Sequence, residues 1–165
     1  MEAILRVIAA DREAALEELK AFLRIPSVSG DPARRGEVRR AAAWVADRLR
    51  GLGCQVEVLE TPGHPIVYGE WMGAPGRPTL LVYGHYDVQP PEPLELWTTP
   101  PFEPVLRDGK LYARGAVDDK GQVLYEIEAA RGLLRRDGRL PVNLKFLVEG
   151  EEEVGSPHFE QLLTA

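Results

Sequence analysis

The sequence predicts an α/β fold, a three-layer sandwich in which helices cover both faces of a mixed, mainly parallel central sheet. Segments with apolar residues at helical spacing alternate with strand-like segments along the chain. Two of the strand-like segments, "TLLVYGHYDV" and "VNLKFLVEG", are apolar on both faces, which is typical of strands inside such a sheet. A histidine and an aspartate lie at the end of the first strand and several glutamates at the end of the second, where sheets of this class bind their ligands.

The composition is that of one globular domain and excludes several classes of function. The chain has 165 residues, 44% of them hydrophobic, and a formal net charge of -6. Nucleic acid is not expected as a partner, because phosphate binding needs clustered positive charge. Charged residues interrupt the apolar N-terminal segment, so we expect no secretion signal, no membrane partner and a cytoplasmic location. The single cysteine, Cys54, is expected to be buried and without function.

The first half of the chain predicts two helices and a pair of strands. Apolar residues at helical spacing predict a helix over about residues 3–23, which the prolines and glycine of "IPSVSGDP" then stop. A second helix is expected over about residues 34–53, with Gly51 or Gly53 as its exit. "CQVEVLE" alternates with a period of two, and "PIVYGEW" is rich in strand-forming residues. These segments are expected to pair through the turn "TPGHP".

In the second half, strands and helices alternate around one hairpin. The run of residues 80–83 predicts a strand buried in the middle of the sheet. "FEPVLRDGKLYARG" indicates a hairpin of two short strands around Asp108 and Gly109. A helix over about residues 120–136 is expected next, then the buried strand "VNLKFLVEG", and a final helix after "EGEEEVGS".

The segment "GHYD" places a histidine and an acid at the end of the first buried strand. His85 and Asp87 are two residues apart, so both side chains point to one face if the strand continues through them. Imidazole is the commonest metal ligand and usually needs its other nitrogen held by a carboxylate, for which Asp87 is the local candidate. The alternative is a hydrogen-bonded histidine at a strand end.

The segment "RGAVDDKG" places Asp118 and Asp119 directly before a helix. Glycines on either side relax the demands on the local backbone. Two interpretations stay open for these aspartates. They are either part of a functional site or a cap for the helix N-terminus, which is the commonest role of such a residue.

The segment "EGEEEVGS" crowds Glu149, Glu151, Glu152 and Glu153 at the end of the second buried strand. An acidic run is usually a solvated turn, but here desolvation and mutual repulsion would be costly without a positive charge nearby. A divalent cation satisfies that need, and imidazole with carboxylates suits zinc or its neighbours in the first transition row. One glutamate can then bind the metal while its neighbour takes a proton from metal-bound water, which is the arrangement of a hydrolase.

Taken together, these segments resemble the M20 family of metallopeptidases, in particular its dipeptidase and carnosinase-like branch. The resemblance is carried, in the family's order, by "IPSVSG", "LLVYGHYDVQP", a tryptophan followed by "PF", "DGKLYARGAVDDKG" and "EGEEEVGS". It runs from about residue 20 to the end. It implies a truncated fold of the zinc-dependent exopeptidase type, in which residues 1–165 are the N-terminal portion of the catalytic domain and the inserted lid domain is absent.

The resemblance implies a role for each residue of a dinuclear metal site. His85 would bind one metal, Glu153 the other, and the carboxylate of Asp118 would bridge both. Asp87 would orient His85, and Glu152 would be the general base that activates the bridging water. The two divalent ions are expected to be zinc, with manganese or cobalt as alternatives.

The implied reaction is hydrolysis of the amide bond of dipeptides or N-acyl amino acids by water bound to the two metals. A small peptide or an N-acyl amino acid is therefore the expected substrate. Members of the family also hold the peptide bond after the bridging aspartate in the cis form, here between Asp118 and Asp119.

The sequence departs from the family pattern in length. Family members are more than twice as long and carry a further acidic ligand, the lid and a late histidine ligand after the last motif. His64 in the "PGHP" turn and His158 near the final helix are expected to have ordinary turn and surface roles. The alternative function is a truncated, non-catalytic fragment that binds metal weakly. Its exposed sheet edge would then self-associate, giving a homo-oligomer, or pair with a complementing fragment.

Overall fold

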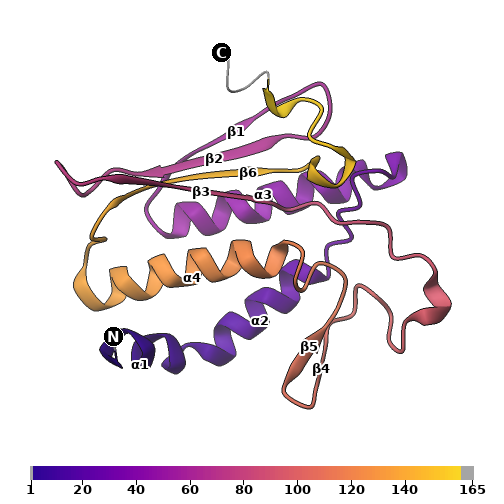
Figure 1. The fold of residues 1–165 in the computed structure, drawn as a ribbon, viewed down its shortest axis with the longest axis horizontal. Helices are drawn as coiled ribbons and strands as arrows, with labels where there is room; N and C mark the ends of the chain where they lie inside the picture. Colours follow the sequence, from indigo (N-terminus) through magenta and orange to yellow (C-terminus); the bar gives the residue numbers. More distant parts are fainter. Residues whose placement is uncertain (1, 161–165) are drawn as a thin grey trace.

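The computed structural model describes residues 2–160, which form a mixed α/β fold around a four-stranded sheet (Figure 1). The helices are α1 (Glu2–Ala10), α2 (Arg12–Leu23), α3 (Arg35–Gly51) and α4 (Lys120–Asp137), with short 3-10 helices η1 (Pro32–Arg34), η2 (Leu94–Leu96) and η3 (Glu152–Val154). The strands are β1 (Gln55–Leu59), β2 (Ile66–Trp71), β3 (Thr79–His85), β4 (Val105–Arg107), β5 (Lys110–Tyr112) and β6 (Asn143–Glu149). No helix within residues 2–160 combines the length and apolarity needed to cross a membrane.

The sheet is mixed, with the strand order β1-β2-β6-β3. Only β3 and β6 pair in parallel, whereas β1 with β2 and β2 with β6 are antiparallel. The prediction of a mainly parallel sheet is therefore wrong for the described residues. The connections explain the difference, because the short turn from β1 to β2 permits only an antiparallel pair, while α4 supplies the crossover that a parallel pair needs.

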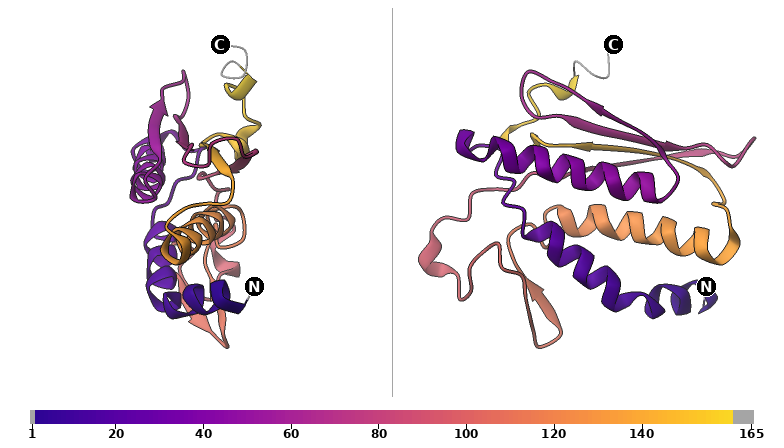
Figure 2. Two further views of the ribbon diagram at one scale, coloured as in Figure 1. Left: turned by 90° about the vertical axis from the view of Figure 1, so that its left-hand side faces the viewer. Right: turned by 180° about the vertical axis from the view of Figure 1, so that it is seen from behind.

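The α-helices of the described chain lie on one side of the sheet. In Figures 1 and 2, α3 and α4 lie against that side, and α1 and α2 lie beyond α4. On the opposite face, Leu81 and Tyr83 of β3 are 57% and 48% exposed. The predicted covering of both faces is thus wrong for residues 2–160, and β3 is an edge strand rather than a middle one. A strand with apolar side chains on both faces can be buried on both faces, but this pattern does not tell which part of a protein would cover each face.

Several local predictions are confirmed. β1 and β2 pair through the predicted turn, and β6 is buried along most of its length. Asp108 and Gly109, both with positive φ (51° and 73°), turn the β4–β5 hairpin. Cys54 is buried, and this burial raises the pKa of its thiol to about 11. The predicted final helix lies largely outside the described residues.

The predicted first helix is divided at Asp11 into α1 and α2. The side chain of Asp11 forms an ion pair with Arg135 of α4, so the point where α1 and α2 meet is attached to the neighbouring helix. α1 packs on α4 at Gly132, where an added Cβ would lie 3.0 Å from Ile8. The small size of glycine suits this position, because a larger residue would press against the Ile8 side chain.

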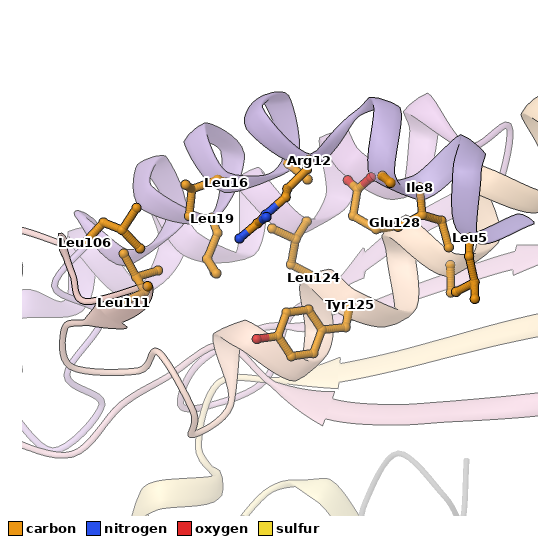
Figure 3. A pocket seen from close by; sticks show the side chains of 14 residues that line it. Leu5, Ile8, Arg12, Leu16, Leu19, Leu106, Leu111, Leu124, Tyr125 and Glu128 are labelled. Carbon is orange, nitrogen blue, oxygen red and sulfur yellow. The ribbon is translucent and has the colours of Figure 1, made fainter.

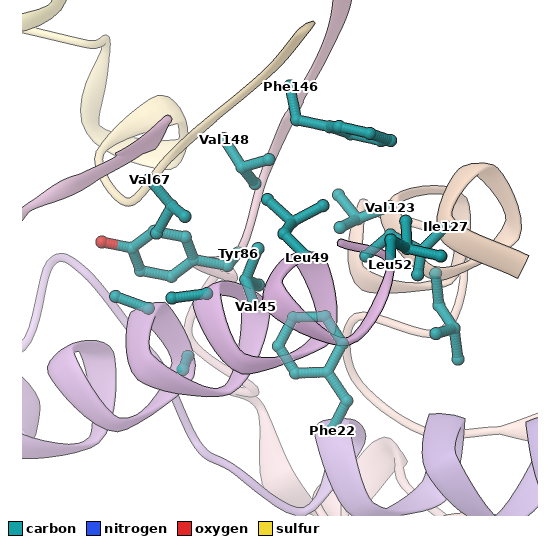
Figure 4. Packing of buried hydrophobic residues seen from close by; sticks show 14 of the residues in the cluster. Phe22, Val45, Leu49, Leu52, Val67, Tyr86, Val123, Ile127, Phe146 and Val148 are labelled. Atoms are coloured by element: carbon teal, nitrogen blue, oxygen red, sulfur yellow. The ribbon is translucent and has the colours of Figure 1, made fainter. Parts of the chain in front are cut away.

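The hydrophobic core lies between the sheet and the helices (Figure 4). The rings of Phe22 in α2 and Trp44 in α3 stack with their centroids 4.1 Å apart. Val45, Leu49 and Phe146 bring α3 and β6 into the same cluster. Because this core fixes β6, it also fixes the point where the strand ends and the acidic segment begins.

A second apolar region is an open groove between α1, α2, α4 and the β4–β5 hairpin (Figure 3). Its volume is about 540 Å³. Arg12 and Glu128 also line it, and Glu128 pairs with Arg131 at 2.5 Å. The apolar lining comes from Leu5, Ile8, Ala9, Ala15, Leu16, Leu19, Leu106, Leu111, Leu124 and Ala129. We call this region the helical groove.

Candidate metal centre

The parallel pair of β3 and β6 brings the histidine and the acidic segment together. Their register places His85 opposite Glu149, so both strands end at the same edge of the sheet. α4 begins at Lys120 and packs beside β3, which carries Asp118 to this edge as well. Segments that are 33 to 68 residues apart in the chain thus meet because of one strand register.

His85 is buried and contacts three acidic side chains. Its Nε2 lies 3.0 Å from Asp118 Oδ1 and 3.8 Å from Glu152 Oε2. Its Nδ1 lies 3.3 Å from Asp87 Oδ1 and 3.2 Å from the Asp87 carbonyl oxygen. One nitrogen is therefore held by Asp87, while the other faces the more exposed acids.

Asp87 is fully buried and connects the two strand ends. Besides contacting His85, its carboxylate accepts the backbone N–H of Glu152 at 3.3 Å and of Glu153 at 3.1 Å. These amides belong to the first turn of η3, whose N–H groups have no partner within the turn. The sequence predicted that Asp87 orients His85, but it did not predict that Asp87 also fixes the backbone of Glu152 and Glu153.

The four glutamates of the acidic segment divide into two kinds. Glu149 is buried and accepts hydrogen bonds from the Tyr83 hydroxyl at 2.7 Å and the Ser156 hydroxyl at 2.8 Å. Glu151 is also buried and lies 2.8 Å from His158 Nδ1. Burial raises the pKa of Glu149, although both hydroxyls oppose that effect. These two glutamates therefore have structural partners of their own.

Glu152 and Glu153 instead lie with His85 in a cluster that could hold a metal ion. One ligand atom from each of these three side chains lies within 4.8 Å of the other two. Two carboxylates and an imidazole are a donor set that zinc and related divalent ions accept. Asp118, which the resemblance makes the bridging ligand, contacts His85 but is not within this group of three, and its side chain is 69% exposed.

The electrostatics of this edge also fit a bound cation. Burial lowers the pKa of His85, but the hydrogen bond and charge of Asp87, with the charges of Asp119 and Glu152, outweigh it and raise the pKa to about 9. The surrounding acids therefore favour positive charge at the imidazole. A divalent cation in place of the imidazole proton would meet the same requirement.

Asp119 does not cap α4 with its side chain, although it occupies the N-cap position. Its Oδ2 accepts the backbone N–H of His85 at 3.1 Å. The peptide bond between Asp118 and Asp119 is cis, as the resemblance implied. Gly84 is required beside this contact, since an added Cβ would lie 2.7 Å from Asp119 Oδ2. The capping interpretation is therefore wrong for the Asp119 side chain.

Two further residues around the site were missed. Gln89 donates from Nε2 to Glu153 Oε2 at 2.8 Å. In the sequence, its position two residues after Asp87 was the only indication that it could point toward the site. Lys120 is fully buried, and its burial lowers its pKa to about 7 while the charge of Asp87 opposes this. The two remaining histidines have other partners, because His64 Nε2 lies 3.1 Å from the Ser29 carbonyl oxygen and His158 faces Glu151.

Comparison with known sequences gives dipeptidases as relatives. The chain is 36% identical to the Beta-Ala-His dipeptidase of Rattus norvegicus, over 99% of this chain and 36% of the relative. It is 33% identical to a Cys-Gly metallodipeptidase of Schizosaccharomyces pombe, over 100% of this chain and 37% of the relative. The chain thus spans little more than a third of the length of these proteins.

Solved structures give the same result for the fold. The structure superposes on human carnosine dipeptidase 1 with a TM-score of 0.93 at 36% identity, covering 98% of this chain and 37% of that one. The TM-score with the dipeptidase Dug1p of Saccharomyces cerevisiae is 0.90 at 29% identity, covering 98% and 37%. Residues 81–164, which include His85 and the acidic segment, match the sequence profile of peptidase family M20/M25/M40. This match covers half of the chain, which therefore belongs to peptidase family M20/M25/M40.

Proposed function

We propose that residues 1–165 are the N-terminal portion of the catalytic domain of a metal-dependent hydrolase that cleaves amide bonds of dipeptides or N-acyl amino acids. The observation that carries this proposal is the cluster of His85, Glu152 and Glu153 at the ends of β3 and β6, with Asp118 beside it. The names of the relatives, Beta-Ala-His dipeptidase and Cys-Gly metallodipeptidase, support a small peptide as the substrate.

The ligands proposed for two divalent ions, zinc in the first instance, are His85 for one, Glu153 for the other and Asp118 for both. Bound there, such ions would polarise the substrate carbonyl and lower the pKa of water. Asp87 would keep the His85 ring oriented, since it is buried and holds Nδ1. Gln89 would hold the Glu153 carboxylate.

Glu152 is the proposed general base. Its backbone is fixed by Asp87, while its side chain is 42% exposed and can reach a substrate from solvent. Its Oε2 lies 3.8 Å from His85 Nε2, beside the proposed ligands. A carboxylate so positioned can take a proton from the attacking water and give it to the leaving amine.

A second candidate function is supported by the open edge of the sheet. Each ion would have two of the proposed ligands, because Asp118 is shared by both. Catalytic zinc usually has three protein ligands. β3 is an edge strand with three exposed apolar side chains, Leu80, Leu81 and Tyr83. Such an edge can pair with a second copy of the chain or with a complementing fragment. In this alternative the chain binds metal weakly and is not itself a catalyst.

The two candidates are separated by assaying the chain against dipeptides with added zinc, manganese or cobalt. Turnover that Glu152→Gln abolishes, and that the exposed control Glu57→Gln retains, supports catalysis by this chain alone. Absence of turnover, with weak cobalt binding that His85→Ala removes, supports the second candidate. Cobalt binding that His85→Ala and Glu153→Gln leave unchanged would contradict the proposed metal site itself.

A further inference from the structure

The turn Asp118-Asp119-Lys120 attaches the start of α4 to two other elements. Asp119 Oδ2 accepts the backbone N–H of His85, the last residue of β3. Lys120 Nζ donates to the carbonyl oxygen of Phe22 at 3.2 Å, at the end of α2, and to that of Ile25 at 2.6 Å, in the loop after the helix. The side chains of Asp119 and Lys120, which follow Asp118 directly, thus connect the turn to the end of β3 and to the end of α2.

The contact made by Asp119 satisfies an amide that the sheet leaves free. Neighbouring amides of a strand point in opposite directions, and the amide of Tyr86 is the one that donates to Glu149 of β6. The amide of His85 therefore points toward the open side of β3. Asp119 is its acceptor, so this aspartate fixes the backbone of His85 relative to α4.

Lys120 is an unusual residue for its surroundings. It is 0% exposed, its Nζ lies 4.9 Å from the centre of the Phe22 ring, and its stem packs against Gly115, where an added Cβ would lie 3.3 Å from Lys120 Cδ. Burying a lysine amine is costly unless its donors are satisfied, and an apolar side chain would fill the same space without that cost. The carbonyls at a helix C-terminus carry partial negative charge and suit such a donor.

Asp118 has little else to hold it in place. Its side chain is 69% exposed, and its contact with His85 depends on the position of the turn. We propose that Asp119 and Lys120 are positioning residues that hold Asp118 against His85. Asp119 attaches the turn to the end of β3, and Lys120 attaches it to the end of α2. The proposal rests on the metal site proposed above, but its geometric part can be tested without a metal.

The metal-free test is amide hydrogen exchange of the 165-residue chain. Asp119→Ala is expected to increase the exchange rate of the His85 amide at least tenfold, while amides in β6 stay unchanged. Asp119→Asn keeps an oxygen acceptor and is expected to restore protection. Lys120→Met keeps the length of the side chain and is expected to accelerate exchange across residues 115–121. If Asp119→Ala leaves the His85 amide protected, the proposal is wrong.

The second readout is cobalt affinity, measured by titration at a temperature where each variant is folded. Loss of a residue that orients metal ligands typically weakens affinity about 10- to 100-fold, and we expect at least a tenfold loss for Lys120→Met and Asp119→Ala. The control is Ile127→Ala, in the buried part of α4 away from the turn. It is expected to lower the melting temperature but to keep cobalt affinity within about twofold of the wild type.

The outcomes separate the two proposals. Equal losses of affinity in Ile127→Ala and Lys120→Met would mean that Lys120 acts only through stability, which would overturn its positioning role. A wild-type chain that binds no cobalt would overturn the metal site, whereas the exchange data would still decide whether Asp119 and Lys120 fix the turn. If Lys120→Met does not fold, the pair Asp119→Ala and Asp119→Asn keeps the test decisive.

Discussion

The carboxyl ends of β3 and β6, with the acidic side chains that meet there, form a region that we call the polar edge. The polar edge and the helical groove are built in opposite ways. At the edge, the buried carboxylates of Asp87, Glu149 and Glu151 each have a hydrogen-bond or ion-pair partner. For Asp87 and Glu149 these partners include groups of a distant segment, the Glu153 amide and the Tyr83 hydroxyl. The groove is lined mainly by aliphatic side chains, several of them half exposed, with few directional contacts. Directional contacts specify one arrangement, whereas aliphatic contacts tolerate several. The edge should therefore be sensitive to single atoms, and the groove should not.

The largest expected effect comes from removing the carboxylate at the centre of the edge. Asp87→Ala would leave the partly buried amides of Glu152 and Glu153 without their acceptor, and His85 Nδ1 would keep only the backbone carbonyl oxygen of residue 87. Since each unsatisfied buried group costs about 1–3 kcal/mol, we expect the free energy of unfolding to fall by roughly 3 kcal/mol. Urea denaturation measures this change. Asp87→Asn keeps one oxygen acceptor and should lose less, and a loss below about 1 kcal/mol in both variants would contradict the comparison.

A second test adds one methyl group at the edge. An added Cβ at Gly150 would lie 2.3 Å from the hydroxyl oxygen of the buried Tyr86. Gly150→Ala should therefore lower the free energy of unfolding by roughly 2 kcal/mol, because the packed ring cannot move freely. The matched control is Gly36→Ala in α3, where an added Cβ meets nothing within 4 Å. This control should instead stabilise by about 0.5–1 kcal/mol, since alanine favours the helix.

A smaller effect concerns the pH dependence of stability. Burial raises the pKa of Glu149 above its ordinary value of 4.5. The folded state then holds the proton more tightly than the unfolded state, so this stabilising contribution is complete below pH 4.5 and is lost as the pH rises through the folded pKa. Glu149→Gln remains neutral and keeps an acceptor for Tyr83 and Ser156. Melting temperatures from pH 4 to pH 7 should therefore fall less steeply in this variant than in the wild type or in Glu57→Gln.

The smallest effect is expected in the helical groove. Leu106 of β4 lines the groove and is 50% exposed. Leu106→Ser should change the free energy of unfolding by no more than about 0.5 kcal/mol, as is usual for surface positions. Urea denaturation decides the point, and a loss comparable to that of Asp87→Ala would show that the groove is as strictly specified as the edge.

The same contrast explains how much could be predicted from the sequence. Periodicity predicted the β1–β2 pair, the β4–β5 hairpin, α3, α4 and the buried strand β6, because these depend on local pattern. It did not predict that β3 is an edge strand, since both faces of residues 80–83 are apolar wherever the strand lies. Strand order is set by connections and by neighbouring segments, which periodicity does not report.

For the candidate site, the residues that bear the chemistry could be named from the sequence, and the structure brings His85, Glu152 and Glu153 together with Asp118 beside them. The assignment of ligand and base roles among them stays a prediction. The residues that hold these side chains in place were harder to find. Gln89, Asp119 and Lys120 act across distances of 64, 34 and more than 90 residues in the chain, and no local pattern encodes such partners.

The parallel register of β3 and β6 has a consequence for how this chain can vary. Because His85 lies opposite Glu149, the part of the excursion before the turn that carries Asp118, residues 90–112, can gain or lose length without changing which side chains converge. Displacement of β3 by a single residue would instead turn the imidazole away from the carboxylates, since alternate residues face opposite sides. Tolerance to insertion and intolerance to strand slippage are therefore two results of the same pairing.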